Sequence, residues 1–437
     1  MKEIFDIPGT AVQAAITEVE DTTGVFDFDS RIPYRPVPGD ARHRYCPWGV
    51  DDLLPYRLQE LLSGDEVCAQ NLHFLSKTCY GMGVHFRAAE GAESRLQAAE
   101  AWAERQMLPA YWMEQCTDMK CYSFSVAVVL LNREGTRINR IVHKEACHCR
   151  LGRADGRGRI PFVYYADWAN RPQRAERIPL LDERDPLGDL LQRMGREPRR
   201  DGSLQQEGGR KFAILMRYPT VGCRYYPVPY WSAVFRGGSY DEKRLISTAK
   251  RAKLKHHTSV KYQVEIERGY WERIVQDAGI TDVEEAKAFV KARKEEIRDF
   301  VCGLENQGKV WITGFYVNPD GHEVRDIRVV CLDAQKEGGD WGDDLNISAN
   351  TMCYGFGLHP NLVGAVPGKS QTNNSGSDKR ELFTMQQALE RSYHDLLLIP
   401  LRLACRFNGW AGVRPVVPMV LLTTLDKHTD AVSVVEE

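Results

Sequence analysis

The stretch MCYGFGLHPNLVG, residues 352–364, decides the fold because it joins two helical patterns through a turn. Upstream of it, residues 345–356 have the spacing of a helix. Downstream, residues 367–377 read PGKSQTNNSGS, a composition that packs poorly and predicts a mobile loop. A helix is expected directly after this loop, with Asp378 as its N-cap and Glu381 at the third helical position.

The helix after the loop is the longest one that the sequence predicts. Its apolar positions are Leu382, Met385, Leu389, Leu396, Leu397, Leu403 and Phe407. Roughly 30 residues at ~1.5 Å each give about 45 Å, with a kink at Pro400. Residues 409–437 then supply one last strand and a tail.

Two further helices precede the opening stretch, and both carry only a thin apolar stripe. The first is expected over 237–257 and the second over 282–305, with a strand and a short helix between them at 258–281. The stripe residues are Leu245, Ala249 and Ala252 on the first helix, and Val290, Ile297 and Phe300 on the second. Such stripes cannot bury themselves, so these helices need a neighbour.

The remaining segments indicate an α+β chain. Residues 1–45 look like an extended arm rich in proline, and two strands are expected between 310 and 332. Three helices are predicted between 51 and 106, followed by an antiparallel β region over 122–216. Its polar insertion, near 188–210, is better read as a solvated loop than as a nucleic-acid patch, because acids intersperse its arginines.

Composition excludes several classes of protein. Of the 437 residues, 43% are apolar and 27% are charged, which allows a sizeable core in two or three domains. The 58 Lys and Arg against 60 Asp and Glu rule out a nucleic-acid binder that works by bulk positive charge. No apolar run is long enough for a membrane span and no signal peptide is evident, so we expect a cytosolic protein.

The twelve cysteines are scattered and are expected to be mostly reduced, buried thiols. Two clusters are candidate metal sites: Cys116 with Cys121, and Cys147 with Cys149 beside two histidines. A zinc site usually pairs cysteines two to four residues apart, whereas a single residue separates Cys147 from Cys149. A metal-binding regulator therefore stays an alternative, with no metal predicted.

Enzyme motifs are weak. The stretch Gly368-Lys369-Ser370 ends like a phosphate-binding loop, but the spacing is one residue short and no buried strand precedes it. A cytosolic nucleotide-dependent enzyme stays a second alternative. The sequence otherwise predicts no catalytic residue, no cofactor and no enzymatic activity.

The order of elements, with the Phe-Gly, Pro and Leu-x-Gly positions of residues 352–364, resembles the portal proteins of tailed bacteriophages. The resemblance covers about residues 45–425. It implies a β-rich wing over 46–236, stem helices over 237–257 and 282–305, and a clip over 258–281. Return strands, a helix and a tunnel loop would fill 306–377, and the long helix 378–408.

The function that the resemblance implies is that of a head-tail connector. Portal subunits form a ring, usually dodecameric, at a capsid vertex of the virion, and are assembled in the host cytoplasm. Double-stranded DNA passes through the ring during packaging and ejection. The ring would bind the terminase large subunit, the head-tail adaptor, and capsid and scaffold proteins, with no membrane involved.

Three sets of residues receive roles from the resemblance. Lys369, Lys379 and Arg380 match positions in the tunnel loop and at the base of the long helix, so the resemblance assigns them to the DNA channel. The alternative is that they are solvated surface charges. The clip aromatics Tyr262, Tyr270 and Trp271 would bind partner proteins, or pack within the ring. The stem stripe Leu245, Ala249, Ala252, Val290, Ile297 and Phe300 would be covered by neighbouring subunits.

Overall fold

The structure is a computed structural model that falls into two compact units. It describes residues 4–6, 13–15, 45–49, 51–170, 174–199, 202–204, 206–222, 225–255, 262–302, 315–317, 323–331, 341–363, 376–422 and 432–435. The first unit comprises residues 1–246 and 342–437, and the second comprises residues 247–341. Because the second unit is one continuous stretch, the first is assembled from both ends of the chain.

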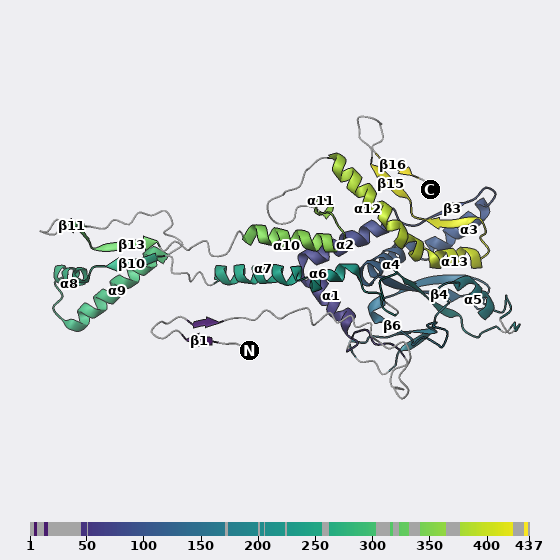
Figure 1. Cartoon of the computed structure of the whole chain (residues 1–437), viewed down its shortest axis with the longest axis horizontal. Helices are drawn as coiled ribbons and strands as arrows, with labels where there is room; N and C mark the ends of the chain where they lie inside the picture. The colour runs from purple at the N-terminus through teal and green to yellow at the C-terminus, as the bar shows by residue number, and fades with distance from the viewer. Residues whose placement is uncertain are drawn as a thin grey trace. The chain divides into compact units, whose positions relative to one another are not determined.

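The described helices of the first unit pack around small antiparallel sheets (Figure 1). The helices are α1 (Leu54–Gly64), α2 (Glu66–Tyr80), α3 (Glu93–Glu104), α4 (Leu108–Tyr122), α5 (Pro186–Arg193), α6 (Ala233–Arg236), α10 (Trp341–Gly355), α11 (Pro360–Val363), α12 (Gly376–Leu397) and α13 (Ile399–Phe407). Helix α7 (Ser239–Lys255) begins in the first unit and crosses the boundary at residue 247.

The described strands of the first unit form small antiparallel sheets. They are β1 (Ile4–Asp6), β2 (Gln13–Ala15), β3 (His85–Ala88), β4 (Phe124–Leu131), β5 (Ile138–Lys144), β6 (Cys149–Leu151), β7 (Phe162–Tyr165), β8 (Glu176–Pro179), β9 (Lys211–Arg217), β14 (Val413–Val416), β15 (Met419–Leu422) and β16 (Val432–Val435). The three-stranded sheets have the orders β5-β4-β9 and β6-β7-β8, and the two-stranded sheets pair β1 with β2, β15 with β16, and β3 with β14. The pairs β4–β9 and β3–β14 join segments that are far apart in the sequence.

Strand β4 lies at the centre of the first unit and is buried on both faces. Side chains alternate across a strand, so its even-numbered and odd-numbered residues face opposite ways. Phe124, Val126 and Val128 belong to one apolar cluster, which also takes in α1, α6 and the β6-β7-β8 sheet. Ala127 and Val129 belong to another cluster, formed with α3, α4 and α13. The strand therefore divides two cores.

A buried ion pair attaches the start of α7 to the start of α2. Asp65 is the N-cap of α2 and accepts the backbone N–H of Val67 and Cys68 at 3.0 and 2.9 Å. Its other oxygen lies 2.5 Å from Nζ of Lys243 on α7, and both side chains are buried. Burial alone would lower the pKa of Lys243, but hydrogen bonds to Asp65 and Glu66 outweigh it and raise that pKa.

A second buried ion pair attaches α12 to α4. Nζ of Lys120 lies 2.5 Å from Oε2 of Glu390, and these side chains are 5% and 2% exposed. The same ammonium lies 3.4 Å from the ring centroid of Tyr393. One turn on, Nε2 of His394 lies 2.7 Å from the carbonyl oxygen of Cys79. Helix α12 is thus fixed to α2 and α4 by polar contacts in the interior.

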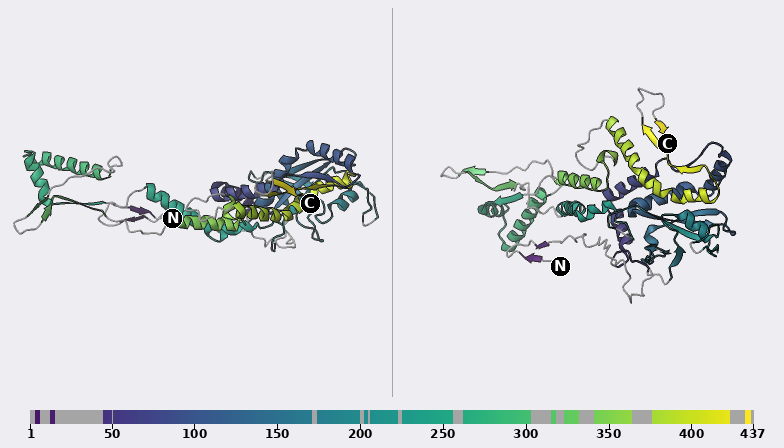
Figure 2. Two further views of the ribbon diagram at one scale, coloured as in Figure 1. Left: turned by 90° about the horizontal axis from the view of Figure 1, so that it is seen from above. Right: turned by 45° about the vertical axis from the view of Figure 1, so that its right-hand side comes forward.

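The described part of the second unit contains two strand pairs and two helices, seen from two further sides in Figure 2. Its described elements are β10 (Tyr262–Ile266), α8 (Arg268–Asp277), α9 (Val283–Cys302), β11 (Phe315–Val317), β12 (Glu323–Arg325) and β13 (Ile327–Cys331). Strand β13 pairs antiparallel with β10, with Val329 opposite Val264. The strand expected at 310–314 lies outside the described residues.

Several elements differ from the sequence prediction. The long helix, which was predicted with a kink at Pro400, is interrupted there and forms two helices, because Pro400 lies in the first turn of α13 and cannot donate the backbone bond that would continue α12. Helix α4 was not predicted. The polar insertion begins with α5 rather than being all loop, and the described part of the N-terminal arm includes the strand pair β1–β2.

Removing one partner of the Lys120–Glu390 pair should destabilise the protein strongly. Lys120→Met leaves a buried carboxylate unpaired, which typically costs about 3–5 kcal/mol. The double variant Lys120→Met/Glu390→Leu removes both charges and should recover most of that loss, since an apolar pair of similar size is often neutral. Urea unfolding of the two variants and the parent measures this. Equal stability of the single and double variants would contradict it.

The same cluster should make stability depend on pH. Burial raises the pKa of Glu390 from 4.5 to about 7, against the opposing effect of Lys120. The folded protein then holds an extra proton between these values, so the free energy of unfolding should fall as pH rises through that interval. His394 acts in the same direction: burial lowers its pKa, but contacts with Cys79 and Glu390 raise it overall.

Urea unfolding of the parent and of Glu390→Gln between pH 5 and 8 measures this dependence. The variant should be less stable throughout and should lose stability less steeply as pH rises, because one titrating group is gone. A slope unchanged by the substitution would show that Glu390 titrates in its ordinary range.

Candidate functional site

Two of the three aromatic residues predicted for the clip, Tyr270 and Trp271, lie together on α8. Their ring centroids are 5.3 Å apart at an interplanar angle of 71°, an edge-to-face contact, and both side chains are half-buried. Glu267 caps the helix by accepting the N–H of Gly269 at 2.8 Å. That bond, with Arg273 beside it, lowers the pKa of Glu267.

Other parts of the second unit hold this aromatic pair in place. Arg273 is 3.0 Å from Glu267 and 2.6 Å from Asp326, which ties α8 to the start of β13. Nζ of Lys294 on α9 lies 5.1 Å from the ring centroid of Trp271. Tyr262, the third predicted aromatic, is on β10 opposite Cys331, but its side chain is not among those described. The structure therefore brings two of the three together.

The predicted stem stripe is split between exposed and buried positions. On α7, Leu245 is 48% exposed and Ala249 is also exposed. On α9, Val290 is half-buried and Ile297 is buried. The side chains of Ala252 and Phe300 are not among those described. Helix α7 contacts the first unit through other residues, Tyr240 and Lys243, each 4% exposed.

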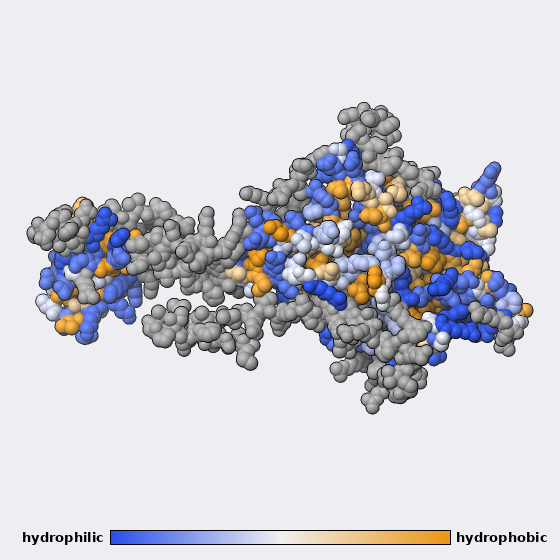
Figure 3. Space-filling model, viewed as in Figure 1, coloured by the Kyte–Doolittle hydropathy of each residue, from blue (hydrophilic) through white to orange (hydrophobic). Residues whose placement is uncertain are grey.

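Helix α10 adds apolar side chains that were not predicted as contact residues. Ile347 and Tyr354 are 61% and 84% exposed, and at seven residues apart they share one helix face. Oγ of Ser348 donates to Glu242 at 2.9 Å, which places α10 beside the first turn of α7. Figure 3 shows hydrophobic residues over both helices. We call Leu245, Ile347 and Tyr354 the α7–α10 surface.

The base of α12 carries two of the predicted DNA-channel residues. Helix α12 begins at Gly376, so Asp378 lies in its first turn and is not the N-cap that the sequence predicted. Lys379 is exposed and Arg380 is half-buried, with acidic neighbours at 378 and 381 that balance them. Lys369 lies outside the described residues.

Two apolar residues further along α12 also face outward. Met385 and Leu389 are 62% and 65% exposed, although both were predicted to belong to the apolar stripe of this helix. They are four residues apart, so they share one face. The apolar residues of α12 therefore occupy more than the one face that packs against the protein. Apolar residues on a second face of a helix indicate a second contact surface.

The candidate metal-ligand cysteines are buried thiols. Nine cysteines of the described residues are free and buried, Cys147 and Cys149 among them. Burial raises the pKa of Cys147 to about 11 and that of Cys149 well above its ordinary value. Across the described residues, no group of three His, Cys, Asp or Glu side chains is placed to hold a metal. Gly368-Lys369-Ser370 lies outside them.

In the part of the chain that the structure describes, no helix is long and apolar enough to cross a membrane. No protein-family model matches the sequence, and neither does any curated protein.

Solved structures share the fold at low sequence identity. A chain of the virion of a native gene transfer agent particle has a TM-score of 0.53 at 10% identity, covering 83% of this chain and 82% of that one. A chain of the neck of the empty particle, computed with C6 symmetry, gives 0.53 at 11%, with 83% of each chain covered. A chain of the native neck, computed with C12 symmetry, gives 0.52 at 10%, covering 83% and 82%. This chain therefore has the mixed α+β fold of a neck component of a phage-like particle, in agreement with its resemblance to the portal proteins of tailed bacteriophages.

Proposed function

We propose that this chain is a portal subunit, which forms a ring at one vertex of a virion and a channel for DNA. The observation that carries the proposal is the shared fold with particle-neck chains over 83% of this chain. One of those necks was computed with C12 symmetry, which is why we propose a dodecamer. The function is structural, with no catalytic step.

Ring formation gives the exposed apolar side chains a partner. Burial of apolar surface contributes about 25 cal/mol per Å², so an exposed cluster favours association. The α7–α10 surface and the outward pair Met385 and Leu389 are such clusters in a single chain. In a cyclic ring each subunit uses two different surfaces, and every subunit contacts two neighbours.

The proposed channel has to let DNA slide. Each lysine or arginine held on a phosphate releases counterions, and a dense basic lining would bind DNA too tightly to move. A net charge of −2, with Lys379 and Arg380 balanced by adjacent acids, fits a conduit with sparse contacts. We place Lys369 with them, as the resemblance suggests.

We assign the second unit the role of the clip and the stems that carry it. Aromatic side chains are enriched at protein interfaces, and Tyr270 and Trp271 on α8 keep part of their surface in solvent. The terminase large subunit would dock there during packaging and the head-tail adaptor afterwards. Capsid and scaffold proteins would contact the wing.

Electron microscopy of the purified protein tests the proposal most directly. The expected result is a population of rings with a central hole. A monomer or dimer at micromolar concentration, which also fails to form rings with capsid partners, would overturn it.

Charging the α7–α10 surface should block ring assembly without unfolding the chain. Tyr354→Asp and Leu245→Asp place a carboxylate in the proposed subunit contact, where it would lose its hydration. Tyr354 is 84% exposed and Leu245 about half exposed, at 48%, so the stability of the monomer should change by about 0.5 kcal/mol or less for Tyr354→Asp and by about 1 kcal/mol at most for Leu245→Asp. Mass photometry measures assembly, and Val221→Asp, 90% exposed in a turn, is the matched control. Rings of normal mass from both variants would exclude this surface.

Neutralising the base of α12 should weaken binding to DNA. For Lys379→Ala/Arg380→Ala, the slope of log affinity against log salt should fall by about 0.9 for each phosphate that the parent side chains neutralise. The measurement is binding of short duplex DNA to rings over a salt series. Arg105→Ala, which removes an exposed charge just after α3, should leave the slope unchanged. Equal slopes in all three proteins would mean that the two residues are solvated charges only.

A further inference from the structure

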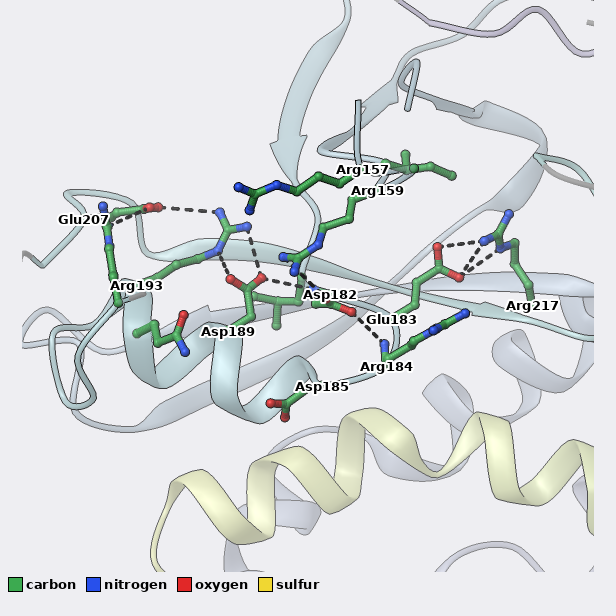
Figure 4. A pocket seen from close by; sticks show the side chains of 15 residues that line it. Arg157, Arg159, Asp182, Glu183, Arg184, Asp185, Asp189, Arg193, Glu207 and Arg217 are labelled. Carbon is green, nitrogen blue, oxygen red and sulfur yellow. Dashed lines mark hydrogen bonds and ion pairs between the residues drawn. The ribbon is translucent and has the colours of Figure 1, made fainter. Parts of the chain in front are cut away.

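The outer edges of the central sheet β5-β4-β9 are covered in two different ways. The edge of β9 is covered by the main chain that follows β8. Leu180 forms a parallel bridge with Ala213, and the N–H of Leu181 donates to the carbonyl of Ala213 at 2.9 Å. Glu183, two residues on, accepts from Arg217 at the end of β9 at 2.8 Å, as Figure 4 shows. An ion pair therefore fixes a strand-like segment along this edge.

Side chains, rather than a strand, cover the outer edge of β5. Asn408, at the end of α13, accepts the N–H of Ile138 at 2.7 Å and donates to the carbonyl of the same residue at 3.1 Å. Gln106, just after α3, accepts the N–H of Ile141 at 3.1 Å and donates to the carbonyl of Asn139 at 3.0 Å. Each carboxamide thus pairs one backbone donor and one backbone acceptor of this edge.

These bonds are the ones that a neighbouring strand would make. In an antiparallel ladder two opposite residues exchange both of their N–H···O bonds, which is how Asn408 bonds to Ile138. In a parallel ladder a residue bonds to the residues before and after its counterpart, which is how Gln106 bonds to Asn139 and Ile141. An ionised carboxylate could not do this because it donates no hydrogen bond, and a hydrocarbon side chain neither donates nor accepts one.

The same arrangement recurs on α12. Gln387 accepts the N–H of Val420 on β15 at 3.0 Å and donates to the carbonyl of that residue at 2.8 Å. Among the described residues β15 pairs with β16 alone, so its other edge is the one that Gln387 covers. A carboxamide on a neighbouring helix is therefore a repeated way of covering a strand edge in the first unit.

The edge of β5 lies where another molecule could reach it. Asn139 and Arg140 are exposed, so this strand runs at the surface of the first unit. Without the carboxamides, Nε1 of Trp102 would still donate to the Asn139 carbonyl, at 3.1 Å, but the other three backbone groups would be open to a strand from another molecule. Strand β5 ends at Lys144, so only a short stretch follows the covered residues, and very short edge strands pair poorly.

We infer that Gln106 and Asn408 close the edge of β5 against pairing with the same edge of a second copy of this chain. Identical antiparallel edges can pair about a two-fold axis, so an open β5 would be its own partner. The carboxamides already satisfy the groups that such a contact would use, so the contact would gain little. This part of the surface is thereby limited to contacts between side chains. The inference holds whether or not the chain forms a ring.

The double variant Gln106→Met/Asn408→Leu tests the inference, because it keeps the size of both side chains and removes both amides. The full-length variant and the parent are incubated at equal concentration, each at the same interval below its own unfolding temperature, which corrects for lost stability. The pelletable fraction and the thioflavin T fluorescence should rise several-fold faster in the variant. In the pellet, the amides of residues 138–144 should be protected from deuterium exchange.

Gln115→Met is the matched control. The Gln115 amide is also buried and donates to the carbonyl of Val126 at 3.2 Å, but β4 is the inner strand of its sheet, so this substitution opens no edge. The control should aggregate at the rate of the parent. Each single variant, Gln106→Met or Asn408→Leu, opens half of the edge and should give a smaller increase, so the test does not require the double variant to fold.

Three results would each overturn the inference: an unchanged rate in all the edge variants, an equal increase in Gln115→Met, or unprotected amides at 138–144 in the pellet. Ring formation is measured separately by electron microscopy, so failure of this inference is distinguishable from failure of the proposed function.

Discussion

The requirement that both faces of β4 be covered organises the first unit. A strand with one face in solvent needs a packed layer on its other face only. Strand β4 (Phe124–Leu131) is apolar on both faces, so it needs a packed layer on each. One layer contains α1, α6 and the β6-β7-β8 sheet, and the other contains α3, α4 and α13.

Helices α7 and α12 are attached to this body by charge rather than by apolar area. Each carries few buried apolar residues and is joined to the interior by one lysine–carboxylate pair, Lys243 with Asp65 and Lys120 with Glu390. A buried pair contributes little net stability, because desolvation offsets the attraction, but a shift of one helical turn would leave two charges unpaired. We interpret these pairs as setting the position of each helix, which leaves its apolar residues available on the outside.

The sequence predicted elements whose signals are local. The helices predicted between 51 and 106 and the β region predicted from residue 122 could be read without knowing their partners. The buried residues of helix α4 do follow helical spacing, at 108, 111, 112, 115, 116 and 119. The helix was missed because polar residues, Gln115 and Lys120, stand among its buried positions.

The partner of Lys120 is Glu390 on α12, far along the chain, so the spacing of residues around Lys120 could not predict this ion pair. Likewise, Met385 and Leu389 were predicted in the apolar stripe of the long helix but are exposed. Periodicity shows that residues share a helix face, and it does not show whether that face packs inside the same chain.

The pairing of β3 with β14 has a consequence for synthesis. Residues 85–88 gain their hydrogen-bonding partner only after residues 413–416 have left the ribosome. The second unit, by contrast, is one continuous stretch, residues 247–341. The segment made in the middle can therefore complete its own contacts while β3 of the first unit still waits for β14. The edge of β3 stays open for most of translation, and an unpaired edge is where a nascent chain is most exposed to pairing with the wrong strand.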